Sequence, residues 1–182
     1  MRVITGSAKG RRLEAPLGLD TRPTSDRTKE GMFSIVQFEV EQSDVLDLFA
    51  GSGQLGIEAL SRGARMAIFI DQSRDAQAVI LDNLTRAGLR ERARVSQMDA
   101  TSFLRGCREH FDLAFLDPPY HQGILTALLP LVAPLIRPSG ILLCETQHDE
   151  VLPDAAGDMT QKREYRYGHA KVTTYRRGEE VL

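Results

Sequence analysis

Residues 45–60 read VLDLFAGSGQLGIEAL and pass from an apolar run through a glycine-rich turn into a second apolar stretch. Gly51 and Gly53 permit positive φ angles and a close approach of the backbone to a ligand. The helix expected after the turn would offer free N–H groups to the polar end of that ligand. The order strand, glycine turn, helix is typical of α/β proteins that bind nucleotides. This stretch therefore predicts both the fold class and the place of a ligand.

Short apolar runs continue along the chain and alternate with longer amphipathic or mixed segments. This alternation predicts βα units and a parallel sheet. The apolar spacing predicts a helix over residues 75–87, with Gly88 as its C-cap. The predicted strands are residues 45–49, 66–70, 93–97, 113–116 and 140–145.

The last segment has a different pattern. Residues 162–167 and 171–176 alternate in polarity around a turn at Gly168-His169-Ala170, as the strands of an antiparallel hairpin do. We therefore expect the sheet to end with antiparallel pairing.

Ahead of the sheet, the first 43 residues predict a small hairpin around residues 8–10 and a helix after Pro23. Ser25 or Asp26 could cap this helix. Its apolar residues would pack on the main body and leave its basic residues outside; these apolar residues are Met32, Phe33, Ile35 and Val36.

The chain has 182 residues, of which 42% are hydrophobic and 26% charged, as expected of one soluble globular domain. Cys107 and Cys144 lie far apart, and none of the four histidines joins them at a zinc-binding spacing, so we predict no metal site. The longest apolar run, residues 124–136, contains two prolines and is too short to span a membrane. Residues 1–16 lack the apolar core of a signal peptide. These features predict a cytoplasmic protein with reduced thiols.

The charges are unevenly distributed, although the formal net charge is only −2. Residues 1–31 carry seven Lys or Arg against four Asp or Glu, and residues 162–177 carry six against Glu164 alone. The middle of the chain is correspondingly acidic. If the two basic ends meet in space, they would suit an anionic partner; ordinary solvated charge is the alternative.

Three aspartates lie at positions that suit a ligand of the glycine turn. Asp71 follows Gly51 by twenty residues and could accept from both hydroxyls of a ribose, which satisfies the dinucleotide-binding fingerprint and makes NAD one candidate. Asp47 lies inside the first strand, where its charge would not help a pyrophosphate but would attract an ammonium group. Asp99 could accept from an adenine amino group, or it could cap a helix over residues 101–105. S-adenosylmethionine (AdoMet) has an amine, a sulfonium, a ribose and an adenine but no phosphate, so it suits this set better. The chain also has no room for the substrate domain of a dehydrogenase.

The tetrapeptide Asp117-Pro118-Pro119-Tyr120 follows the fourth predicted strand, at the sheet edge where ligands bind in open parallel sheets. The prolines fix φ and remove two backbone donors, so the Asp117 carboxylate and the neighbouring carbonyls form a rigid surface of acceptors. Asp117 and the Pro118 carbonyl could hold the amino group of a nucleobase and direct its lone pair at a methyl donor. Tyr120 would stack on the base. A rigid loop with a packed tyrosine is the alternative; we take Asp117, Pro118 and Tyr120 as the candidate catalytic residues.

At this point the sequence resembles the AdoMet-dependent amino-methyltransferases, and within them the RsmD-like group that methylates guanine N2 in small-subunit ribosomal RNA. The resemblance covers nearly the whole chain. Residues 1–13 (MRVITGSAKGRRL) and 21–27 (TRPTSDR) look like the opening of that group. Residues 47–53 and 55–64 are similar to its cofactor loop, and residues 117–120 to its catalytic tetrapeptide.

The resemblance implies a Rossmann-like class I methyltransferase fold, with a seven-stranded, mostly parallel sheet whose last strand is antiparallel. It also implies AdoMet as cofactor and a target guanine in 16S rRNA within an assembling 30S subunit. Adenine amino-methyltransferases use similar tetrapeptides, so the identity of the base depends on the N-terminal segment and the overall length. The sequence departs from the usual pattern at Gln54, where a small residue is common, and at the Gly168-His169 turn.

We assign nine residues to the cofactor site: Asp47, Phe49, Ala50, Gly51, Gly53, Asp71, Gln72, Asp99 and Ala100. By resemblance, Arg22, Thr24 and Arg27 lie near the mouth of the site and contact RNA. The basic N-terminal segment adds Arg11 and Arg12 to the RNA-binding residues. Other basic residues that could contact phosphates are Lys9, Lys29, Lys162, Arg163, Arg166 and Lys171.

We expect one methyltransferase domain over residues 1–182, with an RNA-binding extension in residues 1–43 and the AdoMet-binding catalytic core in residues 44–182. We expect a monomer that binds 16S rRNA or the 30S subunit and binds neither a membrane nor a metal. Two alternatives stay open. One is an adenine-N6 methyltransferase acting on RNA or DNA, and the other is a non-catalytic NAD-binding module.

Overall fold

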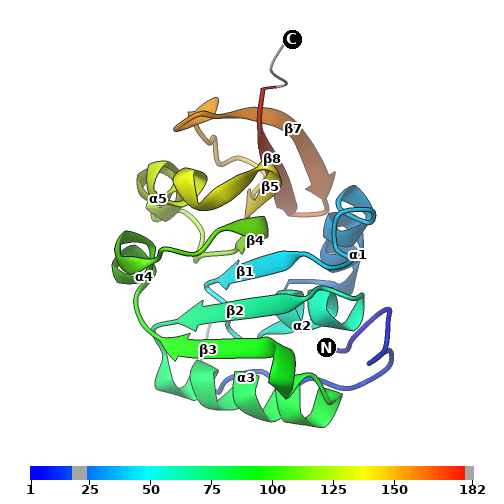
Figure 1. Cartoon of the computed structure of the whole chain (residues 1–182). Coiled ribbons are helices and arrows are strands. Elements are labelled where there is room, and N and C mark those ends of the chain that lie inside the picture. The colour runs from blue at the N-terminus through cyan, green and yellow to red at the C-terminus, as the bar shows by residue number, and fades with distance from the viewer. Residues whose placement is uncertain (18–23, 179–182) are drawn as a thin grey trace.

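A mixed sheet forms the centre of the computed structural model, which describes residues 1–17 and 24–178 (Figure 1). Within these residues the sheet has eight strands in the order β3-β2-β1-β4-β5-β8-β7-β6. Strands β1 to β5 pair in parallel, and β8 is antiparallel to both of its neighbours. The strands are β1 (Asp44–Leu48), β2 (Met66–Asp71), β3 (Ala93–Gln97), β4 (Phe111–Leu116), β5 (Ile136–Gln147), β6 (Ala155–Ala156), β7 (Met159–Tyr167) and β8 (Ala170–Arg177).

The predicted parallel sheet with an antiparallel end is confirmed, but the structure has one strand more than the seven expected. The additional strand, β6, pairs with β7 through only two residue pairs at the sheet edge. A two-residue strand leaves no periodic signal in a sequence. Strand β5 is also longer than the predicted residues 140–145. The prediction missed the start of the strand because residues 137–139 are polar or exposed and interrupt the apolar run.

Helices cover both faces of the sheet and divide the core into two clusters. Residues of α1 (Asp26–Ile35), α2 (Gln54–Ser61) and α3 (Arg74–Ala87) pack on one face, with strand residues such as Val45 and Phe115. Residues of α4 (Ala100–Gly106) and α5 (Ile124–Val132) pack on the other, with Leu46 and Leu116. Neighbouring residues of β1 belong to opposite clusters because successive side chains of a strand point to opposite faces.

Side-chain caps fix where the helices begin. Ser73 accepts from the N–H of Ala76 at the start of α3, and Gly88 ends this helix in the left-handed conformation, as predicted. Of the two caps considered for α1, Ser25 is the one observed, since its hydroxyl accepts from the N–H of Thr28 at 3.1 Å. Such caps stabilise a helix by about 1 kcal/mol each.

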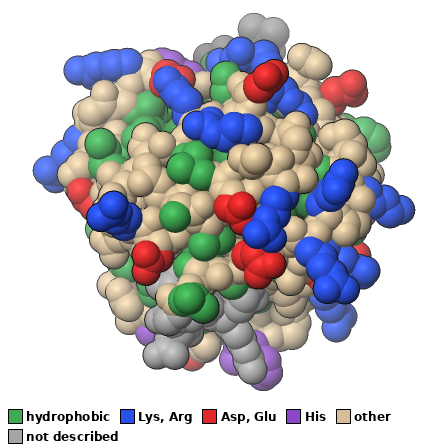
Figure 2. Space-filling model, turned by 90° about the horizontal axis from the view of Figure 1, so that it is seen from below, with side chains coloured by type: hydrophobic (Ala, Val, Ile, Leu, Met, Phe, Trp, Pro, Cys, Tyr) green, Lys and Arg blue, Asp and Glu red, His purple; other side chains and the backbone are tan. Residues whose placement is uncertain are grey.

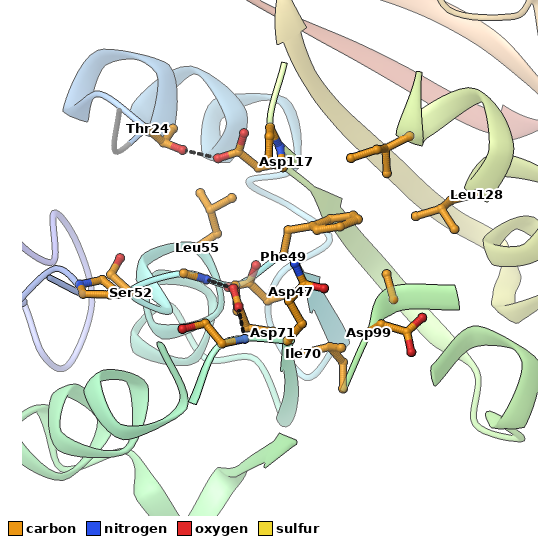
Figure 3. Close-up of a pocket in the computed structure, with 18 of the residues that line it drawn as sticks. Thr24, Asp47, Phe49, Ser52, Leu55, Ile70, Asp71, Asp99, Asp117 and Leu128 are labelled. Atoms are coloured by element: carbon orange, nitrogen blue, oxygen red, sulfur yellow. Dashed lines mark hydrogen bonds between the residues drawn. The ribbon is translucent and has the colours of Figure 1, made fainter. Parts of the chain in front are cut away.

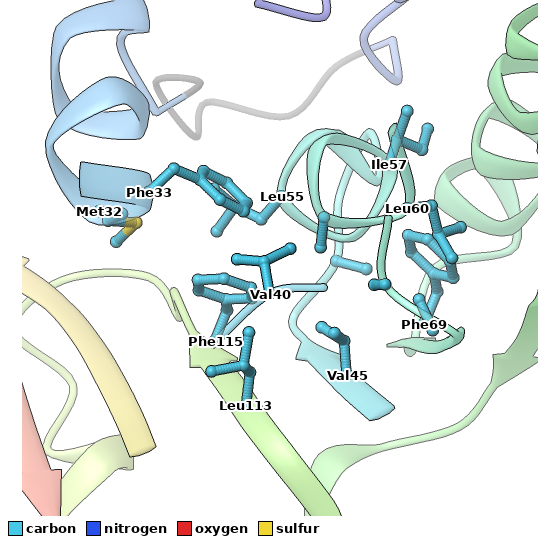
Figure 4. Packing of buried hydrophobic residues seen from close by; sticks show 14 of the residues in the cluster. Met32, Phe33, Val40, Val45, Leu55, Ile57, Leu60, Phe69, Leu113 and Phe115 are labelled. Carbon is cyan, nitrogen blue, oxygen red and sulfur yellow. The ribbon is translucent and has the colours of Figure 1, made fainter. Parts of the chain in front are cut away.

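Helix α1 packs on the sheet through its apolar face, as expected. Met32, Phe33 and Val36 are fully buried, and the rings of Phe33 and Phe115 lie 5.3 Å apart (Figure 4). The predicted hairpin near the N-terminus is present as one antiparallel bridge between Arg2 and Arg12. The N-terminal segment also contacts α2 and the glycine turn, since the Ile4 N–H donates to Glu58 Oε2 at 2.8 Å and the Ser52 hydroxyl lies 3.1 Å from Met1 Sδ.

The two basic ends of the chain meet in space. Helix α1 lies against β7, where a Cβ on Gly31 would stand 2.2 Å from the ring of Tyr167. A side chain at position 31 would therefore have to displace the ring of Tyr167. The basic segments 1–31 and 162–177 are therefore neighbours, as binding of one anionic partner by both of them requires.

Candidate active site

Three residues with positive φ angles shape the turn between β1 and α2. Gly51 and Gly53 have φ values of 57° and 79°, and Phe49 has a φ of 68°, which is strained for a residue with a side chain. The N–H of Gly51 donates to Asp71 Oδ2 at 2.9 Å, and the N–H of Ser73 donates to Asp71 Oδ1 at 2.9 Å. Asp71 therefore connects the glycine turn to the end of β2.

A cavity of about 670 Å³ opens beside this turn at the carboxyl ends of the central strands (Figure 3). Its size is that of a typical small-molecule site. It is lined by eight of the nine residues assigned to the cofactor: Asp47, Phe49, Ala50, Gly51, Asp71, Gln72, Asp99 and Ala100. The ninth, Gly53, is not among the lining residues; it is buried and caps α2.

The cavity wall carries acceptors rather than cations. Four aspartates line it, namely Asp47, Asp71, Asp99 and Asp117, and no described Lys or Arg residue does. A ligand with positive charge and several N–H or O–H donors fits such a wall, whereas a phosphate group does not.

Asp47 is buried in β1, where its Oδ2 accepts from the N–H of Gly56 at 2.8 Å. Burial raises the pKa of Asp47 to about 8, and repulsion from Asp117 and Asp71 adds to the increase. Burial therefore favours the protonated form of this carboxyl at neutral pH, and a cationic ligand nearby would favour its ionised form.

Asp99 caps a helix and also lines the cavity, so the structure is compatible with both roles considered for it. Its Oδ1 caps α4 by accepting from the N–H of Ser102 at 3.0 Å, and hydrogen bonds from Ser102 keep the pKa of Asp99 below its usual value. The residue is exposed and also lines the cavity. Capping one oxygen leaves the other free to accept from a ligand.

The residues of the tetrapeptide divide between two cavities. Asp117 lines the large one, Pro118 and Tyr120 line a smaller cavity of about 110 Å³, and Pro119 lines both. The Tyr120 hydroxyl donates to Glu145 Oε1 at 2.8 Å. The ring of Tyr120 thus borders the smaller cavity, and its stacking on a base stays a prediction.

Asp117 belongs to a buried network that the sequence did not reveal. The Thr24 hydroxyl donates to Asp117 Oδ2 at 2.7 Å (Figure 3). It also lies 3.2 Å from Glu145 Oε2. Burial raises the pKa of Asp117 to about 6. Burial, together with repulsion from Asp117, raises the pKa of Glu145 to about 8. Burial also raises the pKa of Tyr120, so its hydroxyl stays protonated.

Thr24 lines the large cavity, and its contact with RNA stays a prediction. Thr24 is only 6% exposed, and its hydroxyl is occupied by two carboxyl groups. Gln54 holds the same residue through its backbone, since Gln54 Nε2 donates to the Thr24 carbonyl at 3.2 Å. Thr24 is therefore placed to orient Asp117.

Two lysines expected to contact phosphates are buried instead. Lys29 Nζ lies 3.8 Å from Glu58 Oε2 and donates to the Arg2 carbonyl at 2.6 Å. Lys171 Nζ lies 2.9 Å from Glu164 Oε1. Burying a lysine without a partner is costly, and these acceptors explain why both side chains turn inward.

Other predicted RNA-binding residues are exposed, as that role requires. These are Lys9, Arg11, Arg12, Arg27, Lys162, Arg163 and Arg166, whereas Arg22 lies outside the described residues. One face of the molecule carries many Lys and Arg side chains with Asp and Glu between them, rather than one continuous basic patch (Figure 2).

Glu145 is the main functional candidate that sequence reasoning missed. It lies inside the apolar strand β5, where an isolated acidic residue has no neighbours in sequence that suggest a role. The sequence did place a carboxyl group in an otherwise apolar strand. Buried carboxyl groups are rare and require partners, so this position could have been singled out.

The described residues contain neither a metal-binding cluster nor a membrane-spanning helix. No group of three or more His, Cys, Asp or Glu residues is arranged to hold a metal ion in this part of the chain. No helix within residues 1–17 and 24–178 is long and apolar enough to cross a membrane.

Comparison with known proteins places residues 1–176 on the family model described as "Conserved hypothetical protein 95". The chain is 40% identical over 182 residues to "Putative rRNA methyltransferase YlbH" of Bacillus subtilis, covering 97% of this chain and 99% of that one. It is 32% identical over 181 residues to "Ribosomal RNA small subunit methyltransferase D" of Escherichia coli K12, covering 97% and 90%.

A solved structure of similar fold is "Putative methyltransferase yhhF from Escherichia coli". It matches with a TM-score of 0.87 at 32% identity over 99% of both chains. The match therefore includes the N-terminal segment as well as the sheet.

Proposed function

Because the chain belongs to the "Conserved hypothetical protein 95" family, we propose that it is an AdoMet-dependent methyltransferase that methylates the N2 amine of a guanine in 16S rRNA. The relatives' names support methylation of rRNA. The choice of guanine N2 and of the assembling 30S subunit rests on the resemblance of the N-terminal segment and the tetrapeptide. The observation that carries the reaction class is the presence of Asp117 on the wall of the acidic cavity beside the glycine turn.

The residues of the cavity fit AdoMet. Asp47 would ionise beside the ammonium of AdoMet, and Asp71 and Asp99 keep lone pairs for hydroxyl and amino donors. When bound, AdoMet supplies a methyl group activated by its sulfonium. The protein's own part is to bind, to orient and to exclude water.

Asp117 is the residue proposed to hold the acceptor amine. Thr24 occupies its Oδ2, and Oδ1 has no hydrogen-bond partner among the described residues. Oδ1 and the Pro118 carbonyl can accept the two hydrogens of an exocyclic amine, which directs the nitrogen lone pair towards the cavity. Such positioning lowers a barrier by up to about 7 to 11 kcal/mol when the geometry is optimal.

RNA binding is assigned to the exposed basic residues of both chain ends. Residues 1–43 would form an RNA-binding extension of the core, with Arg11, Arg12 and Arg27 exposed on it. Their contacts would be with phosphates and would not by themselves specify a base.

The test is methyl transfer from labelled AdoMet into 30S particles and into naked rRNA, both from a strain lacking this protein, followed by nucleoside analysis. N2-methylguanosine at one position is the expected product. N6-methyladenosine would keep the chemistry and overturn the base assignment. Absence of transfer, with calorimetry showing tight binding of NAD instead of AdoMet, would overturn the proposal.

A further inference from the structure

Glu145 occupies the centre of a hydrogen-bond network behind Asp117. Glu145 is 3% exposed and lies in β5, the strand next to β4, which ends at Leu116 just before Asp117. Oε1 accepts from the Tyr120 hydroxyl at 2.8 Å, and Oε2 lies 3.2 Å from the Thr24 hydroxyl. Glu145 therefore contacts both ends of the catalytic tetrapeptide, one directly and one through Thr24.

The number of protons in this network determines which of its hydrogen bonds can form. The Thr24 hydroxyl lies within hydrogen-bond distance of two carboxyl groups but has one hydrogen to donate. The shorter distance, 2.7 Å, is to Asp117 Oδ2. If Glu145 carries a proton on Oε2, it donates to Thr24, and Thr24 donates to Asp117. The Thr24 hydroxyl, Glu145 Oε2 and Asp117 Oδ2 then all have a partner, whereas two carboxylates would leave one of these two carboxyl oxygens without a donor on Thr24.

We propose that Glu145 is a positioning residue that works in its protonated form, orienting Asp117 through the Thr24 hydroxyl and fixing Tyr120 through its other oxygen. With a proton on Glu145 and a charge on Asp117, Glu145 donates to Thr24 and Thr24 donates to Asp117. Asp117 Oδ1 then stays available to the acceptor amine. This inference rests on the proposed amino-methyltransferase function.

The charges around the network support this distribution of protons. Burial and repulsion from Asp117 raise the pKa of Glu145, which favours one proton on the pair at neutral pH. The short distance of 2.7 Å from the Thr24 hydroxyl to Asp117 Oδ2 supports Asp117 as the ionised member. Among the described residues, no Lys, Arg or His forms an ion pair with either carboxyl. Other titratable groups near the pair are Tyr120 on the same loop, Asp47 in β1 and Glu150 after β5.

The network predicts how turnover depends on pH. Protonation of Asp117 near pH 6 would remove the acceptor, and ionisation of Glu145 near pH 8 would place two negative charges on one hydroxyl. Turnover should therefore follow a bell-shaped profile, whose two limbs belong to the pair.

The test compares Glu145→Gln with Glu145→Ala. A glutamine can donate to Thr24 through its amide nitrogen and accept from Tyr120 through its oxygen, as a protonated carboxyl does. We expect Glu145→Ala to lose about tenfold or more in kcat with little change in the KM for AdoMet. Glu145→Gln should recover most of that loss and should lack the alkaline limb. Thr24→Ser and Thr24→Val give the matched pair, since only serine keeps the hydroxyl.

Two outcomes would overturn the inference. If Glu145→Gln is as slow as Glu145→Ala, the residue acts as a carboxylate. If Glu145→Gln keeps the alkaline limb, another group is responsible for it. A readout without turnover separates this result from failure of the proposed function: infrared difference spectra at pH 7 should show a protonated-carboxyl band in the wild-type protein that Glu145→Gln lacks. Absence of that band in the wild type would also refute the inference, whatever the enzyme methylates.

Discussion

Replacing Asp117 by alanine tests the proposed reaction most directly. The substitution removes Oδ1, the acceptor proposed for the amine, and Oδ2, which Thr24 occupies at 2.7 Å. A hydrogen bond to a charged group contributes about 1.5 to 3 kcal/mol, which corresponds to roughly 10- to 150-fold in kcat. Asp117 is one of four aspartates that line the cavity, so we expect the Kd for AdoMet to change by less than about tenfold.

The same substitution should not unfold the protein. Burial raises the pKa of Asp117 to about 6, above its value of about 4 in the unfolded chain, so ionisation of Asp117 destabilises the folded state. The stability that the protonated form contributes is therefore lost as the pH rises from about 4 to about 6. At pH 8, removing this charge also relieves repulsion with Glu145 and Asp47. The melting temperature of Asp117→Ala at pH 8 should therefore equal or exceed that of the wild type.

The assay combines single-turnover methyl transfer with calorimetric titration of AdoMet and thermal melts. Asp149→Ala, which removes an exposed carboxyl from the loop after β5, is the control for a change of charge alone. An equal loss of AdoMet affinity and turnover would refute the reasoning, because it would place Asp117 in cofactor binding. A large drop in melting temperature would place it in folding.

Three further predictions follow from other parts of the structure. Replacing Arg11 and Arg12 by alanine should weaken RNA binding and reduce its salt dependence by about one or two units of slope in filter-binding titrations; an unchanged slope would contradict their contact with phosphates. Gly56→Ala should destabilise the fold by about 1 to 3 kcal/mol in urea melts, because the added Cβ would stand 2.3 Å from an aromatic ring, whereas Gly106→Ala has open space and should change stability little. If the ammonium of AdoMet binds beside Asp47, whose pKa is raised to about 8, binding at pH 7 should release a proton, measurable by calorimetry in buffers of different ionisation enthalpy. Asp47→Asn should bind AdoMet without that proton release, and equal release from both proteins would assign it to another group.

Local sequence patterns predicted most of the elements that form the cofactor site. The glycine turn, the strands before it and after it, and the helix ending at Gly88 depend on residues close together in the chain. The placement of Asp71 and Asp117 at one sheet edge follows from the parallel order of the strands. Eight of the nine residues assigned to the cofactor consequently line one cavity.

The protonation state and the hydrogen-bond partners of Asp117, the proposed catalytic carboxyl, could not be predicted from local sequence patterns. Thr24 precedes Asp117 by 93 residues and Glu145 by 121, and their contacts exist only because α1 packs on the sheet. The same packing buries Lys29 against Glu58, which no local pattern distinguished from an exposed lysine.

The sequence by itself determined the order of strands and helices, the glycine turn and the acidic character of the site, since backbone preference and strand polarity act over a few residues. Tertiary structure alone decided which polar groups are buried away from water and which form hydrogen bonds or ion pairs with one another. Desolvation and pairing set the pKa values of Asp47, Asp117 and Glu145, and both depend on distant segments coming together.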